Sequence, residues 1–257
     1  MHEADPTRRF SDRAADYVRA RPAYPDALVD VVQARTDLGP GSLLADLGSG
    51  TGLSAEPFLR RGYRVVGVEP NPAMRAAAEA HLAAFPGFRS VGGTAEATGL
   101  EEGSADGALI AQAFHWLDGA RTRDELLRVL RPPTWAVVAW NTRRTGDTPF
   151  LRGYEALLRR FGTDYEQVRA RTERVASAGA LGAFLRGGYH RDVLENVQEL
   201  DRAGLESRVR SASYVPAPGT PGHAPLMAAL GELFERDAVG GRVRLVYDLE
   251  VYTGRLD

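Results

Sequence analysis

Cysteine and lysine are both absent from this chain of 257 residues, so all 32 of its cationic side chains are arginines. Without cysteine, the chain forms no disulfide, no thiolate metal site and no cysteine nucleophile. Without lysine, it has no amine for a Schiff base and no P-loop, whose pattern requires that residue. The five histidines show no HExxH or similar spacing, so we expect no metal ion.

Long apolar runs and an excess of basic charge are missing as well. No run approaches the ~18 apolar residues of a membrane-spanning helix, and the first ten residues lack the apolar stretch of a secretory signal. The formal net charge is −2, whereas nucleic-acid-binding domains usually carry a basic surface. We therefore expect a cytoplasmic protein that acts on a small molecule, without nucleic acid or membrane partners. The oligomeric state is not predicted.

Short apolar runs alternate with helical patterns in the first half of the chain. Five runs are candidate strands: residues 42–47, 64–68, 88–91, 108–113 and 135–140. Helical patterns cover residues 53–61, 72–85 and 121–130. Because proline is tolerated only in the first turn of a helix, Pro57 predicts a helix start near Leu53 or Ser54. This alternation predicts an α/β fold with a mainly parallel central sheet and helices on both faces.

The character of the chain changes after Asn141. Helical stretches are expected over residues 150–161, 165–177, 201–213 and 226–237, and strands over 190–200 and 242–253. We therefore divide the chain into three parts. The parts are residues 1–141, residues 142–241 with a late strand, and residues 242–257, which form a strand that completes the central sheet.

A glycine loop, DLGSGTG at residues 46–52, follows the first predicted strand and opens a helix. The glycines permit a tight turn, and the free N–H groups at a helix start attract an anion. Glu69 ends the second predicted strand, where a carboxylate can accept hydrogen bonds from both hydroxyls of a ribose. The glycine spacing is GxGxG and not the GxGxxG of dinucleotide enzymes. This spacing disfavours NAD but leaves an NAD(P)-dependent oxidoreductase as an alternative.

These motifs together resemble class I S-adenosylmethionine-dependent methyltransferases. DLGSGTG resembles the first motif of that family, VVGVEP its acidic second-strand motif, and residues 93–96 its adenine-contact segment. Residues 113–116 (AFHW) and the N-terminal RFSDRAADYVRARPAYP resemble a bacterial small-molecule subgroup that includes trans-aconitate-methyltransferase-like proteins. The resemblance implies a Rossmann-like fold with a helical cap after the fifth strand. Residues 1–141 would then form an N-terminal lid helix and the cofactor-binding core, residues 142–241 the substrate-binding cap with a late strand, and residues 242–257 the strand that completes the core sheet. It also implies S-adenosylmethionine as cofactor and S-adenosylhomocysteine as product.

The resemblance also assigns cofactor-binding roles. The methionine end of the cofactor would lie on the glycine loop, against Asp46, Gly48, Ser49, Gly50 and Gly52. Glu69 would hold the ribose, Pro70 or Asn71 would pack near the adenine, and Ala95 and Glu96 would contact it. Thr94 stands where the family often has aspartate, so backbone groups of Ala95 and Glu96 would carry that contact. Gln112 would lie along the cofactor near the reacting atoms.

Two residues near the N-terminus are further candidates. Tyr17 and Arg21 would close over the cofactor, with Arg21 available to its carboxylate. Alternatively, Tyr17 packs in an amphipathic helix with its apolar neighbours.

His115 and Trp116 follow the fourth predicted strand, where ligands bind in open α/β sheets. An aromatic ring there could stabilise a sulfonium cation, and His115 could accept a proton from the acceptor. Alternatively, both residues only shape the pocket. The arginines between Arg143 and Arg174 could receive an anionic acceptor, although solvated helix faces are the simpler interpretation.

The predicted reaction is in-line SN2 methyl transfer to oxygen, nitrogen or a carboxylate of a small molecule. A protein that binds S-adenosylmethionine without turnover is a further alternative.

Overall fold

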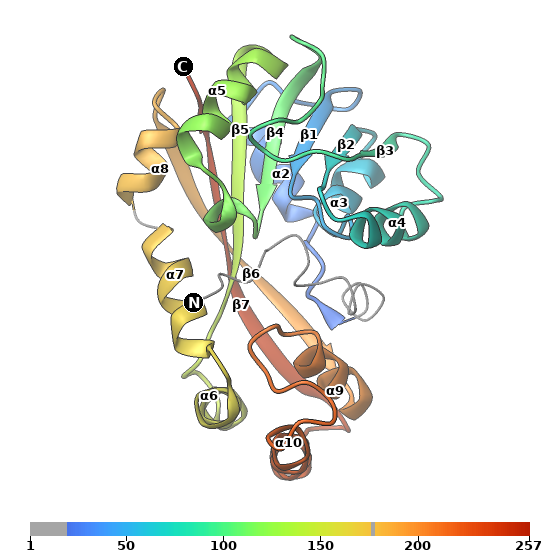
Figure 1. Cartoon of the computed structure of the whole chain (residues 1–257), viewed down its shortest axis with the longest axis vertical. Helices are drawn as coiled ribbons and strands as arrows, with labels where there is room; N and C mark the ends of the chain where they lie inside the picture. The colour runs from blue at the N-terminus through green and yellow to red at the C-terminus, as the bar shows by residue number, and fades with distance from the viewer. Residues whose placement is uncertain (1–19, 176–177) are drawn as a thin grey trace.

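The computed structural model describes residues 20–175 and 178–257. Its centre is a seven-stranded sheet in the order β3-β2-β1-β4-β5-β7-β6 (Figure 1). The strands are β1 (Leu43–Leu47), β2 (Arg64–Val68), β3 (Phe88–Val91), β4 (Ala105–Ala111), β5 (Leu130–Arg143), β6 (Tyr189–Leu200) and β7 (Val243–Arg255). Strands β1 to β5 are parallel, and β7 runs antiparallel to both of its neighbours. The predicted α/β fold class is thus confirmed.

The helices of the described residues connect and cover these strands. They are α2 (Ala27–Arg35), α3 (Ala55–Arg60), α4 (Pro72–His81), α5 (Gly119–Val129), α6 (Pro149–Phe161), α7 (Tyr165–Val175), α8 (Ala178–Phe184), α9 (Arg202–Arg210) and α10 (His223–Asp237). A short 3₁₀ helix, η2 (Phe114–Trp116), follows β4. Ser54 directly precedes α3, and Pro57 lies in its first turn, as the sequence predicts. Helices α2 and α8 are additional to the predicted elements.

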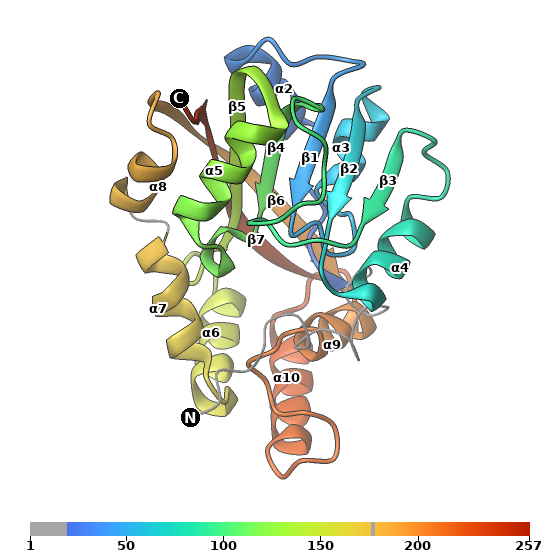
Figure 2. The same ribbon diagram turned by 45° about the horizontal axis from the view of Figure 1, so that its top comes forward.

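Alternating side chains of the strands build a core on each face of the sheet. On one face, Val66 and Ile110 pack in the same cluster as Leu126 of α5. On the other face, Val65 clusters with Leu28 of α2 and with Phe58 of α3. Helices α5 and α2 accordingly lie on opposite sides of the sheet (Figure 2). Strands buried on both faces explain why the sequence shows short continuous apolar runs.

A third cluster forms where β5, β6 and β7 extend beyond the shorter strands. Helices α6, α9 and α10 gather around this extension, in the lower part of Figure 1. Their buried side chains, among them Leu151, Leu205 and Leu230, pack with Leu245 of β7. The sequence-based division places the late strand with the cap. In the structure this strand is β6, the edge strand of the central sheet, and it pairs with β7 along its whole length. The sequence gives no sign of this pairing because about 40 residues separate the two strands.

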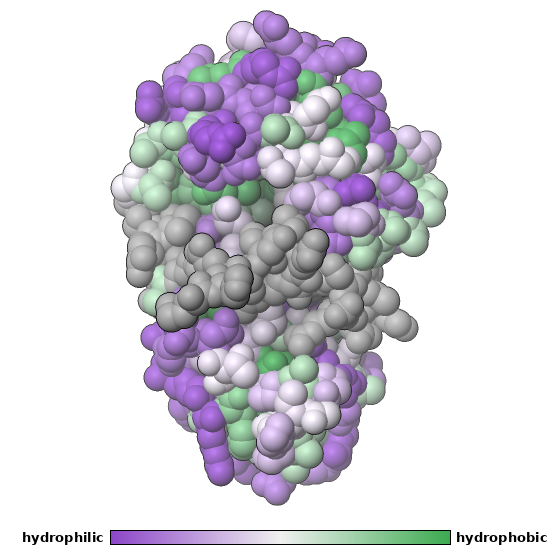
Figure 3. Space-filling view, in the orientation of Figure 1, coloured by the Kyte–Doolittle hydropathy of each residue, from purple (hydrophilic) through white to green (hydrophobic). Residues whose placement is uncertain are grey.

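The surface of the molecule is mixed. Hydrophilic residues cover most of the upper end of the face drawn in Figure 3. None of the described helices combines the length and the apolar character needed to cross a bilayer.

Candidate functional site

The glycine loop connects β1 to α3 at the carboxyl edge of the sheet. Gly48, Gly50 and Gly52 adopt φ angles of +67°, +55° and +79°, which other residues rarely adopt. A Cβ at Gly48 would lie 2.7 Å from Cβ of Ala113, so packing also requires glycine there. At Gly50, by contrast, the nearest atom would be 3.8 Å away, so this part of the loop has room beside its backbone. The loop can therefore accept a ligand in close contact with its main chain.

Buried polar atoms without partners surround this loop. Asp46 is fully buried, and its Oδ2 accepts a hydrogen bond of 2.8 Å from the Ser54 hydroxyl. Within the described part of the chain, Oδ1 of Asp46 and the hydroxyls of Ser49 and Thr51 are buried without a partner. Burial raises the pKa of Asp46 to about 7, against the lowering effect of the Ser54 hydrogen bond. Because buried polar groups are normally hydrogen-bonded, these atoms fit the polar end of a ligand.

Glu69 connects the end of β2 to the same loop. Its carboxylate is 9 % exposed, and it accepts hydrogen bonds from the N–H groups of Gly50 (3.1 Å) and Asn71 (2.9 Å). Burial raises the pKa of Glu69, and these two hydrogen bonds oppose that shift. Each oxygen accepts one bond and has a further lone pair free, as recognition of two ribose hydroxyls requires.

The surroundings of Glu69 fix its position. Asn71 caps α4, since its side chain accepts from the N–H groups of Ala73 and Met74. Arg75 donates from Nη1 to the carbonyls of Glu69 (2.8 Å) and Pro70 (3.0 Å). Sequence reasoning missed Arg75. The only sign in the sequence that Arg75 could reach Glu69 was its position one turn into the predicted helix.

The segment after β3 is held against α5. Thr94 and Ala97 exchange two backbone hydrogen bonds of 3.2 Å, which leaves Ala95 and Glu96 at the turn. Ala95 is buried, and the Glu96 carboxylate accepts from the N–H of Asp118 at 3.0 Å. The Glu96 side chain therefore secures the start of α5, and its backbone is the part that a base could contact.

The clamp on this segment comes from Glu125 of α5, which sequence reasoning missed. Glu125 accepts from the N–H (2.9 Å) and the hydroxyl (2.6 Å) of Thr98 and pairs with Arg128 at 2.7 Å. These hydrogen bonds, that of Arg128 above all, lower the pKa of Glu125 to about 2.

Gln112 and the η2 turn follow β4. Gln112 has a φ of +57°, and its Nε2 donates to the Asn141 carbonyl at 3.2 Å. The rings of His115 and Trp116 are half-buried, with centroids 4.7 Å apart. Phe114 anchors the turn, because its ring packs edge-on against Trp140 (5.9 Å) and Phe184 (4.9 Å).

The two candidates near the N-terminus are Tyr17 and Arg21. Tyr17 lies outside the described residues. Nη2 of Arg21 donates to the Ser211 carbonyl at 3.0 Å, which joins the segment before α2 to the end of α9.

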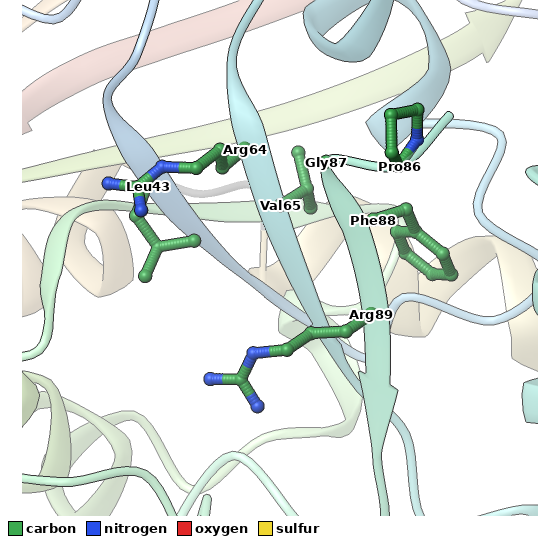
Figure 4. A pocket seen from close by; sticks show the side chains of 7 residues that line it. All are labelled: Leu43, Arg64, Val65, Pro86, Gly87, Phe88 and Arg89. Atoms are coloured by element: carbon green, nitrogen blue, oxygen red, sulfur yellow. The ribbon is translucent and has the colours of Figure 1, made fainter.

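Strand register brings the other candidates together. Leu47 pairs with Val68, and Asp46 pairs with Leu109, so the loop, Glu69 and the end of β4 share one edge. A pocket of about 210 Å³ lies at the opposite, amino edge of the strands (Figure 4). It is lined by Leu43, Arg64, Val65, Pro86, Gly87, Phe88 and Arg89, and it contains none of the predicted site residues. No group of three or more His, Asp or Glu side chains suited to a metal occurs in residues 20–175 and 178–257.

Comparison with known proteins matches part of this chain to a known family. Residues 45–138 match the sequence profile of the family described as "Methyltransferase domain". An uncharacterised methyltransferase of Mycobacterium tuberculosis is 38 % identical over 134 residues, which are 52 % of each chain. An uncharacterised methyltransferase-like protein of Schizosaccharomyces pombe is 31 % identical over 166 residues, 64 % of this chain and 63 % of its own. The matched segment thus spans about half the length of the first of these relatives.

A solved structure shows the same fold. It is that of a putative type II methyltransferase from Anaeromyxobacter dehalogenans, with a TM-score of 0.66 and 24 % identity, and the match covers 92 % of this chain and 98 % of the other. The chain therefore has the Rossmann-like fold of that structure, and its residues 45–138 match a methyltransferase domain, as the motifs predict. The likeness to the trans-aconitate subgroup stays a prediction.

Proposed function

We propose that this chain, with its methyltransferase domain at residues 45–138, transfers the methyl group of S-adenosylmethionine to a small-molecule acceptor. The observation that carries the proposal is the joint position of Glu69 and the glycine loop. The Glu69 carboxylate is fixed against the Gly50 N–H, next to a loop with buried, unpartnered atoms of Asp46, Ser49 and Thr51. This arrangement fits a ligand that has a ribose diol at one end and charged amino-acid groups at the other.

Each group of this edge has a proposed role in cofactor binding. Asp46, Gly48, Ser49, Gly50 and Gly52 hold the amino-acid end of the cofactor. Glu69 binds the ribose, supported by Asn71 and by the Arg75 contacts to the backbone of Glu69 and Pro70. The turn of Ala95 and Glu96 provides backbone contacts to the adenine.

When bound, the cofactor supplies a methyl group on a sulfonium; the electron pair of the acceptor forms a bond to that carbon while the carbon–sulfur bond breaks to a neutral thioether. The chain mainly has to position the acceptor and exclude water. Positioning of this kind can lower the activation barrier by up to ~7–11 kcal/mol. Gln112, His115 and Trp116 stand at the end of β4 beside the loop. We propose that His115 accepts the proton of an acceptor hydroxyl or amine. Trp116 would line the site where the acceptor binds.

The acceptor would lie between this edge and the region of residues 142–241. Helix α7 of that region contacts η2, so the turn that carries His115 and Trp116 faces both parts of the chain. Methylation of oxygen, nitrogen or a carboxylate is compatible with this placement.

The proposal is tested by following S-adenosylhomocysteine formation with the full chain, labelled S-adenosylmethionine and a pool of small metabolites. Wild-type protein is expected to release S-adenosylhomocysteine in step with one labelled product. His115→Ala is expected to bind S-adenosylmethionine as tightly as wild type but to turn over at least 100-fold more slowly, since general base catalysis typically contributes 10²–10⁴-fold.

The control is His190→Ala, which changes an exposed residue of the edge strand β6. Equal turnover of His115→Ala and wild type would show that His115 is structural. Tight cofactor binding without product from any pool would favour a binding protein without turnover.

A further inference from the structure

A buried polar cluster lies in the extension of the sheet, between β5, β7, α6 and α9. Arg143, at the end of β5, pairs with Glu155 of α6 at 2.7 Å and donates to the Tyr165 hydroxyl at 3.0 Å. Its guanidinium carbon is 4.8 Å from the ring centroid of Tyr154. Arg208 of α9 is 5 % exposed, and its Nε is 3.4 Å from the Tyr247 hydroxyl. Two arginines thus lie within the mainly apolar cluster around the sheet extension.

Both guanidinium groups have unused donors. Nη1 of Arg143, Nη1 of Arg208 and the hydroxyl of Tyr154 are buried, and none of the three has a hydrogen-bond partner in the described structure. Tyr154 interacts with both, since Arg143 covers its ring and the Arg208 charge acts on its hydroxyl. Strand register agrees, because Tyr247, the partner of Arg208, is paired with Arg143. One cluster thus contains three buried donors that have no acceptor among the described residues.

The charge of the cluster is not balanced. Glu155 compensates Arg143, whereas the groups that face Arg208 are the hydroxyls of Tyr247, Tyr154 and Tyr214. Burial raises the pKa of Tyr154 to about 12, so this hydroxyl is neutral at physiological pH. Arginine, by contrast, stays charged. One buried positive charge is left, and an uncompensated buried charge is strongly destabilising unless an anion pairs with it.

A line of polar side chains connects this cluster to the glycine-loop edge. Asn141 and Arg143 are two residues apart on β5, so they lie on one face of the sheet about 7 Å from each other. The Asn141 carbonyl accepts from Gln112, and the Asn141 side chain accepts from Asn196 of β6 at 2.9 Å. Helix α7, which begins with Tyr165, contacts the η2 turn. The cluster is thus within reach of a small molecule whose other end lies beside Gln112.

We propose that Arg143, Arg208 and Tyr154 form the binding subsite for a carboxylate group of the methyl acceptor. This inference rests on the proposed function and narrows it to an acidic acceptor whose carboxylate lies on Arg208 while its methylated atom points to Gln112 and His115. A planar guanidinium matches a carboxylate, and a single unbalanced charge matches a monoanion better than a phosphate dianion.

The test measures binding of benzoate, phenylacetate and acetate to the full chain by ligand-observed NMR, with and without saturating S-adenosylhomocysteine. Benzamide, phenylacetamide and acetamide are the matched neutral probes. Wild-type protein is expected to bind at least one carboxylate tenfold or more tightly than its amide. Arg208→Gln is expected to abolish that preference. Arg210→Gln, which changes a partly exposed arginine two residues along the same helix, is expected to retain it.

Tyr154→Phe is the second variant, because it keeps the ring and removes only the unpartnered hydroxyl. Carboxylate affinity is expected to fall several-fold in the Tyr154→Phe variant, and this result decides the question if Arg208→Gln does not fold. No carboxylate preference in wild type, or a preference that stays at the wild-type level in both Tyr154→Phe and Arg208→Gln, would overturn the subsite. Tighter, Arg208-dependent binding of inorganic phosphate would overturn the carboxylate assignment. Failure of wild type to bind S-adenosylhomocysteine would instead contradict the proposed function.

Discussion

Asp46 and Glu69 are two buried carboxyl groups at the same edge of the sheet, and they differ in their hydrogen bonds. Glu69 accepts two backbone N–H bonds, which favour its ionised form. Asp46 accepts one hydroxyl bond at Oδ2, and its Oδ1 has no partner among the described residues. The proposed binding roles follow from this difference, since a fixed carboxylate suits a ribose diol and an unpartnered oxygen suits an added donor.

Glu69→Ala is expected to weaken S-adenosylmethionine binding by about 1.5–3 kcal/mol, the usual contribution of hydrogen bonds to a charged group. The loss includes the anchoring of the Gly50 and Asn71 N–H groups. Isothermal titration calorimetry measures the effect, with Glu79→Ala on the exposed side of α4 as the control. Equal affinity of Glu69→Ala and wild type would remove the ribose assignment.

Asp46→Asn is expected to stabilise the free protein while it weakens cofactor binding. The folded-state pKa of Asp46, about 7, lies above its ordinary value of 3.8. Its ionisation therefore reduces stability progressively as the pH rises from 3.8 to about 7, and fully above that. The uncharged variant escapes this loss and gains on the order of 1–3 kcal/mol relative to wild type above pH 7.

Denaturant unfolding of both proteins between pH 4 and pH 8 checks this expectation, with thermal shifts by S-adenosylmethionine as the second reading. A stability difference that does not change with pH would contradict the assigned burial of the Asp46 charge.

At the scale of elements, the site depends on how α5 holds the segment after β3. Glu125 receives the N–H and the hydroxyl of Thr98, two residues beyond Glu96. Asp118, directly before this helix, donates its N–H to Glu96, so the turn proposed for the adenine is held at Glu96 and at Thr98 just beyond it.

Glu125→Gln tests this clamp through its pH dependence. The folded-state pKa of Glu125 is about 2, below its ordinary value of 4.5, so its stabilisation is complete above pH 4.5 and is lost as the pH falls toward 2. The variant is expected to be less stable than wild type by about 1 kcal/mol near neutral pH, and the difference should shrink below pH 4.5. Urea unfolding at pH 7, 4.5 and 3 measures it. A constant difference across these pH values would mean that the Glu125 charge does not hold the segment.

Much of this element framework can be predicted from local sequence. The apolar runs of β1, β2 and β3 end at turn residues, and Pro57 fixes the start of α3. Other elements have no local sign. Helix α8 (AGALGAF) contains two glycines, which have low helix propensity, and it is helical because its apolar residues pack on the core. The β4 strand begins at Ala105 rather than at residue 108, as its pairing with β5 dictates.

The candidate site divides in the same way. The positions of Glu69 and the loop glycines could be predicted, because these residues directly follow the predicted strands in the sequence. Arg75, Glu125 and Arg208 were not, because their roles depend on contacts that only the tertiary structure brings about. The cap arginines illustrate the limit. Arg152 is exposed as expected of a solvated helix face, whereas Arg143 and Arg208 are buried.

In the whole molecule, one sheet connects the glycine-loop edge to the helical cluster around α6, α9 and α10. Its parallel strands carry the glycine loop and Glu69 at their carboxyl ends, and its three long strands continue into the helical cluster that contains Arg143 and Arg208. Asn141 lies at the junction, in hydrogen bonds with both Gln112 and Asn196. A cofactor on one side and an acceptor on the other would therefore meet along β5.

The most direct test of this account is thermal unfolding of the full chain with S-adenosylmethionine, S-adenosylhomocysteine, NAD and NADP in parallel. A ligand at 100 times its dissociation constant adds about 2.7 kcal/mol of stability, which visibly raises the midpoint. The account predicts a rise with S-adenosylmethionine and S-adenosylhomocysteine and none with the nicotinamide cofactors. A rise with NAD or NADP alone would contradict it and would assign the glycine loop to a dinucleotide.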